Sequence, residues 1–165
     1  MRANFINGGP GVIISGLVWM IAAAVTHYAS FFTGMICFFF VGSLIYPLSE
    51  VVDRMLKPKD TPKPDPKLMK LAMMTLPILF GGLFLAYVMS RTDRSLFYPI
   101  MAIAIGVRYI IFEKLYGLKV FWVLGSVLTA IGVAAILCSN LPPVHVAAAV
   151  GMIEVLFGIY ITSRK

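Results

Sequence analysis

Residues 95–112 read SLFYPIMAIAIGVRYIIF, an apolar stretch in which Arg108 is the only charged side chain. A guanidinium group cannot be deprotonated in a protein. At membrane depth it therefore needs a counter-charge, a polar cavity or a route to the lipid headgroups. The fold must supply one of these three.

The counter-charge that the sequence favours is Glu154, the one carboxylate well inside another apolar stretch, which reads VHVAAAVGMIEVLFGIYI over residues 144–161. At 1.5 Å per residue, Arg108 lies about 18 Å and Glu154 about 15 Å from the same membrane surface. A long arginine side chain can bridge this offset. Glu50, at the end of another apolar stretch, is the alternative partner.

The composition excludes a soluble domain. The 165 residues are 60% hydrophobic and 13% charged, whereas soluble domains are about 45–50% apolar and about 25% charged. The apolar residues also occur in blocks that approach the roughly 20 residues needed to cross a bilayer. The sequence therefore predicts an all-α, polytopic membrane protein with a single domain.

We expect six membrane-spanning helices, arranged as three hairpins. Between the second and third, residues 50–70 form a linker whose segment KPKDTPKPDPK (residues 57–67) has a proline spacing that excludes helix. Pro47 is expected to kink or end the second span, and Pro77 with Gly81 and Gly82 to kink the third or bring it close to a neighbour. The predicted spans are residues 11–28, 31–48, 71–89, 96–112, 120–138 and 144–161.

The basic residues predict the orientation and the partners. Eleven of the 14 lysines and arginines fall on one side of a six-span arrangement and two, Arg91 and Arg94, on the other. The positive-inside rule then places both termini in the cytoplasm. With a net charge of +7, the loops are expected to contact anionic lipid headgroups. Nucleic acid is not an expected partner, and the sequence leaves a homo-oligomer open.

The leading functional hypothesis is a midplane pocket that binds or transports a small solute or ion. Arg108 would bind a carboxylate or phosphate of the solute, Glu154 would take up and release a proton, and Tyr109 and Trp19 would line the pocket. Ionisable residues inside a membrane are functional candidates by default. The alternative is a non-catalytic accessory or scaffold protein in which Arg108 and Glu154 form a structural ion pair.

A third hypothesis is a haem or metal redox protein that uses His27 and His145, because histidine is a common metal and haem ligand. The sequence contains no third ligand at a recognisable spacing. It also lacks the H-E-x-x-H, G-x-S-x-G, Walker A and C-x-x-C motifs, so we predict neither an enzyme nor a cofactor. The two cysteines, Cys37 and Cys138, are expected to be free thiols.

Two segments carry a resemblance to a known family: ANFINGGPGVIISGLVW (residues 3–19) and GVRYIIFEKLYGLKVFWVLG (residues 106–125). The chain resembles a family of small, uncharacterised bacterial membrane proteins that cross the membrane several times. The resemblance implies a helical bundle in a bacterial inner membrane. It implies no activity, and no functional residue is carried over from it.

Overall fold

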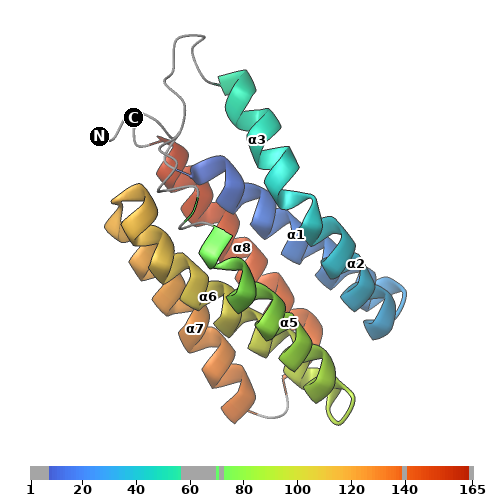
Figure 1. Cartoon of the computed structure of the whole chain (residues 1–165). Coiled ribbons are helices and arrows are strands. Elements are labelled where there is room, and N and C mark those ends of the chain that lie inside the picture. The colour runs from blue at the N-terminus through green and yellow to red at the C-terminus, as the bar shows by residue number, and fades with distance from the viewer. Residues whose placement is uncertain (1–7, 57–69, 71–72, 139–140, 164–165) are drawn as a thin grey trace.

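The structure, a computed structural model, describes residues 8–56, 70, 73–138 and 141–163. These residues form helices joined by short turns, with no strand among them (Figure 1). The predicted all-α fold is confirmed for this part of the chain. In order, the elements are α1 (Gly9–Tyr28), α2 (Phe31–Ser43), α3 (Ile45–Leu56), α5 (Leu76–Ser90), the 3-10 helix η1 (Arg94–Leu96), α6 (Phe97–Tyr116), α7 (Lys119–Leu137) and α8 (Pro143–Ser163).

Four helices in the described part of the chain are long and apolar enough to cross a membrane: α1, α6, α7 and α8. They correspond to the first, fourth, fifth and sixth predicted spans. The apolar helices α2 and α5 are shorter, with 13 and 15 residues. Length and composition therefore indicate insertion into a membrane, with four candidate spans among the described residues, and the six predicted spans stay a prediction.

The second predicted span is interrupted. The helix ends at Ser43, the chain turns at Leu44, and α3 begins at Ile45. Pro47 explains the break, because its ring clashes with the carbonyl group four residues earlier, that of Ser43, and it has no N–H to donate. Residues 50–56, predicted as the start of the linker, instead continue α3. The remainder of that linker, residues 57–69, lies outside the described residues.

The third predicted span has a similar interruption. Residues 73 and 74 are helical, Thr75 forms a turn, and α5 then begins at Leu76 with Pro77 in its first turn. The same loss of a hydrogen bond and clash with the carbonyl group four residues earlier account for the break. Gly82 does bring α5 close to α6, because a Cβ atom there would overlap that of Ala104.

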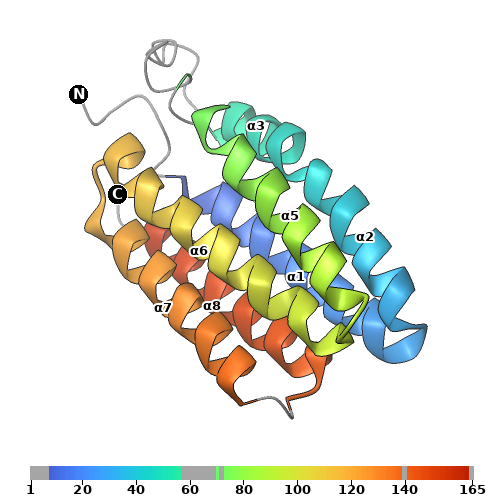
Figure 2. The same ribbon diagram turned by 60° about the horizontal axis from the view of Figure 1, so that its bottom comes forward.

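The four long helices pack as antiparallel neighbours through glycine. In α1 and α8, a Cβ on Gly16 would lie 2.7 Å from the Gly151 carbonyl oxygen, and one on Gly151 would lie 2.8 Å from the Gly16 carbonyl oxygen. Gly106 of α6 and Gly125 of α7 approach each other in the same reciprocal way. Small residues allow such close contacts between helices in lipid. Figures 1 and 2 show α2 and α3 running beside α1, and α5 beside α6.

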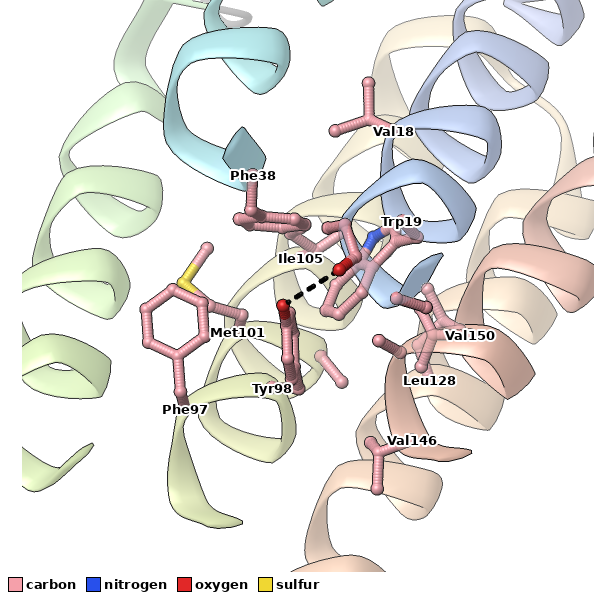
Figure 3. Close-up of a cluster of buried hydrophobic side chains, with 14 of the residues drawn as sticks. Val18, Trp19, Phe38, Phe97, Tyr98, Met101, Ile105, Leu128, Val146 and Val150 are labelled. Carbon is pink, nitrogen blue, oxygen red and sulfur yellow. Dashed lines mark hydrogen bonds between the residues drawn. The ribbon is translucent and has the colours of Figure 1, made fainter. Parts of the chain in front are cut away.

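Aromatic side chains join α1, α2 and α6 at the centre of the bundle (Figure 3). The rings of Trp19 and Phe38 meet edge to face with centroids 4.6 Å apart, and Tyr98 lies 5.9 Å from Trp19. The hydroxyl groups of Tyr98 and Thr26 are 2.6 Å apart. This contact joins α6 to α1 close to Trp19.

Candidate functional site

Glu154 lies on the buried face of α8 and is 0% exposed. The small residues Ala147, Gly151 and Gly158 are also buried on α8. Because Gly151 and Gly158 have no side chain, α1 packs directly against this face of α8. The carboxyl group is therefore enclosed between helices and does not face the acyl chains.

Three side chains from two other helices approach the Glu154 carboxyl group: Ser15 and Trp19 of α1, and Tyr109 of α6. Ser15 and Trp19 are four residues apart, so they share one face of α1. Even so, neither carboxyl oxygen of Glu154 has a hydrogen-bond partner of good geometry in the described part of the chain, and the Trp19 indole nitrogen has none either. The group of Ser15, Trp19, Tyr109 and Glu154 is named the buried carboxyl cluster below.

The buried carboxyl cluster combines acceptors and donors. The carboxyl oxygens accept hydrogen bonds or bind a cation, the indole N–H donates, and the two hydroxyl groups do either. Leaving a buried polar atom without a bond costs about 1–3 kcal/mol. Each unpartnered atom therefore needs an explanation, and this makes the buried carboxyl cluster the candidate site.

The structure does not contain the predicted ion pair between Arg108 and Glu154. Arg108 instead donates a hydrogen bond from Nε to Thr75 Oγ1, at 3.0 Å, and its guanidinium carbon lies 5.0 Å from the centre of the Phe112 ring. Consecutive residues on a helix point about 100° apart. Tyr109 faces α1 and α8, so Arg108 faces the turn that precedes α5. The side chain of Glu50, the alternative partner, lies outside the described residues.

Arg108 thus stabilises the interruption before α5. The turn at Thr75 leaves backbone groups outside the regular helical pattern, and the charged side chain binds the hydroxyl group at that point. Contact with the face of Phe112 is worth about 0.5–2 kcal/mol for a partly buried cation. Sequence reasoning missed Thr75, although Pro77 two residues later marked the position of the break.

The two histidines lie at the same end of the bundle, His27 in the last turn of α1 and His145 in the first turn of α8. Both are exposed. The His27 ring packs edge to face against Tyr28, with centroids 4.9 Å apart. Among the described residues, no group of three or more His, Cys, Asp or Glu side chains could hold a metal ion. Both Cys37 and Cys138 are free thiols, as predicted.

Residues 1–164 match the family described as "Family of unknown function (DUF7010)". The chain belongs to this family. No curated protein and no solved structure matches the chain. The match covers nearly the whole sequence, but the family has no assigned activity. The buried carboxyl cluster is therefore the main indication of function.

Proposed function

We propose that this member of the family is a multi-pass membrane protein that binds a small ion or solute at the buried carboxyl cluster and passes it across the membrane. One observation supports the proposal most strongly. Glu154 is wholly enclosed, and both of its carboxyl oxygens are unpartnered among the described residues. An isolated buried carboxylate costs several kcal/mol, so the group carries a proton or a cation whenever the helices enclose it.

The neighbours of Glu154 suit both of its charge states. When the carboxyl group is ionised, the hydroxyl groups of Ser15 and Tyr109 and the indole N–H of Trp19 can all donate to it. When it is protonated, either hydroxyl group can rotate and accept. The buried carboxyl cluster can therefore exchange a proton or cation without leaving an uncompensated charge, which is the requirement for a site that loads on one side and unloads on the other.

Arg108 supplies a second, separate binding group. Nε is the one guanidinium nitrogen with a hydrogen bond in the described part of the chain, and the terminal nitrogens remain available to a solute carboxylate or phosphate. Tyr109 is next to Arg108 in sequence and approaches the Glu154 carboxyl group. An anionic solute at Arg108 would thereby be coupled to the charge on Glu154 through Tyr109.

A flux assay tests the proposal. The purified protein is reconstituted into liposomes that contain a pH-sensitive dye, and a pH gradient is applied. We expect proton flux with the parent, a loss of at least tenfold in Glu154→Gln, and parental flux in the matched control Glu113→Gln, which removes a carboxylate near the end of α6. Equal flux in the parent and Glu154→Gln would reject Glu154 as the ion-binding group.

We also propose that the chain lies in a bacterial inner membrane with both termini in the cytoplasm, and that α2 and α5, extended by the segments next to their breaks, complete six spans. Lys70, Lys114 and Lys119 are among the described basic residues near one end of the bundle, and Arg91 and Arg94 lie near the other. A reporter enzyme that is active only in the cytoplasm, fused after Lys165, should be active. An inactive but fully expressed fusion would contradict this orientation.

A further inference from the structure

The far end of the bundle from Lys114 and Lys119 contains a cavity that is separate from the buried carboxyl cluster. It has a volume of about 530 Å³ and opens between the start of α2 and the end of α5. One wall comes from α2 and the residue before it, and the other from α5 and the turn that follows it. The lining residues are Ser30, Phe31, Phe32, Met35, Tyr87, Ser90, Arg91 and Arg94.

The cavity carries positive charge. Arg91 and Arg94 are exposed and form no ion pair with any described residue. Asp93 lies between them in sequence but is not part of the lining, and its carboxylate accepts a hydrogen bond from the Ser95 backbone N–H at 2.8 Å. At this end of the bundle α2 begins and α5 ends, so the partial positive charge of one helix end opposes the partial negative charge of the other. The attraction of an anion to the cavity therefore comes from the two guanidinium groups. Their planar sets of donors match a phosphate group.

Apart from Ser30 and Ser90, the rest of the lining is apolar, and part of it faces outward. Phe32 is 58% exposed and Tyr87 is 43% exposed, and both lie at the ends of helices, where aromatic side chains sit at the level of lipid headgroups. Phe31 forms the inner wall by packing edge to face on Phe97 and Tyr98 of α6. A soluble anion would contact only the two arginines, and the aromatic wall would stay exposed.

We propose that this cavity binds one anionic phospholipid. The headgroup phosphate contacts Arg91 and Arg94, and the part of an acyl chain nearest the headgroup packs against Phe31, Phe32 and Met35. The occupant follows from the combination of unpaired cations, an outward-facing apolar wall and a position at the end of the helices. A zwitterionic lipid with the same acyl chains has the same apolar fit but carries its own cation, which the two arginines repel.

Native mass spectrometry of the full-length protein tests the proposal by counting retained lipid molecules. The probes are phosphatidylglycerol and phosphatidylcholine with identical acyl chains. A basic residue near a membrane surface contributes about 1 kcal/mol to binding an anionic lipid, so two contribute about thirty-fold. We expect the parent to retain one phosphatidylglycerol in preference to phosphatidylcholine, and the preference to fall about thirty-fold in Arg91→Gln/Arg94→Gln.

Two further variants sharpen the comparison. Lys114→Gln/Lys119→Gln removes the same charge from the opposite end and should keep the parental preference. Asp93→Asn removes a negative charge but keeps an oxygen that can accept from the Ser95 amide, so it should raise the preference. Equal retention of the two lipids by the parent, or an unchanged preference in the double arginine variant, would overturn the proposal.

Inorganic phosphate separates a lipid site from a site for a free anion. Because the acyl chain contributes to binding, a hundredfold excess of phosphate over phosphatidylglycerol should leave the lipid bound. Full displacement by phosphate at that excess would show that the arginines bind a soluble anion and would overturn the assignment to a lipid. The arginine and lysine variants change exposed residues, so their thermal unfolding should match the parent.

Discussion

Replacing Gly16 by alanine should destabilise the contact between α1 and α8. A Cβ atom at this position would lie 2.7 Å from the Gly151 carbonyl oxygen and 2.8 Å from both the backbone nitrogen and a side-chain carbon of Val155. Two of these three atoms belong to the backbone of α8, so no side-chain rotation relieves the overlap. The two helices must separate by several tenths of an ångström along their line of closest contact.

The size of the effect follows from two opposing terms. Overpacking a closely packed interior costs about 1–3 kcal/mol, whereas alanine gains up to about 1 kcal/mol over glycine in helix propensity. We therefore expect Gly16→Ala to lower the free energy of unfolding by about 1–2 kcal/mol. The change should also move Trp19, one turn further along α1, relative to Glu154.

The assay is unfolding in detergent followed by tryptophan fluorescence, with circular dichroism as a second probe. Gly81→Ala in α5 is the matched control, because a Cβ atom there would have no neighbour within 4 Å. It should leave the stability unchanged or raise it. If Gly16→Ala is as stable as Gly81→Ala, then the α1 and α8 backbones are not in contact and the enclosure of Glu154 is wrong.

Three other predictions concern single contacts. Tyr98→Phe removes the 2.6 Å contact with Thr26 and should lower the free energy of unfolding by about 1 kcal/mol in the same detergent assay; no change would contradict that contact. Arg108→Met and Thr75→Val should be non-additive, because each removes the same hydrogen bond, and strictly additive losses of stability would show that the bond is absent. Hydrogen bonds from the Ser95 side chain and backbone lower the pKa of Asp93 from 3.8, so its carboxylate stabilises the turn before α6 at neutral pH, and this stabilisation is lost as the pH falls through the lowered pKa. An NMR titration of the Asp93 carboxyl carbon should have its midpoint below 3.8, and a midpoint above it would contradict the hydrogen bonds.

The long helices could be predicted from sequence because they depend on one strong property. A mostly apolar composition over about 20 residues predicted the bounds of α1, α6, α7 and α8 to within a few residues at each end. The α2 and α5 regions have the same composition, but each contains a proline. Pro47 was predicted to kink or end its span, and Pro77 to kink its span or bring it close to a neighbour, because a sequence does not reveal whether a proline bends a helix or interrupts it. That outcome depends on which groups bind the freed backbone.

The candidate site was predictable in part for a similar reason. The depth of Glu154 follows from the rise of a helix alone, and Tyr109 and Trp19 were predicted to line the same pocket. The pairing with Arg108 was wrong because depth along the membrane does not give the direction of a side chain around its helix. A difference of one residue, from Arg108 to Tyr109, turns a side chain by about 100°. Only packing against α5 and α8 decides which of the two faces Glu154.

The central claim is that the enclosed Glu154 is neutralised by a proton or a cation. Infrared difference spectroscopy of the purified protein in metal-free buffer, where a proton is the available partner, measures this directly. The account predicts a protonated carboxyl C=O band at neutral pH that is present in the parent and in Glu113→Gln and is absent in Glu154→Gln. Spectra without that band in the parent, or with the same band in Glu154→Gln, would contradict it.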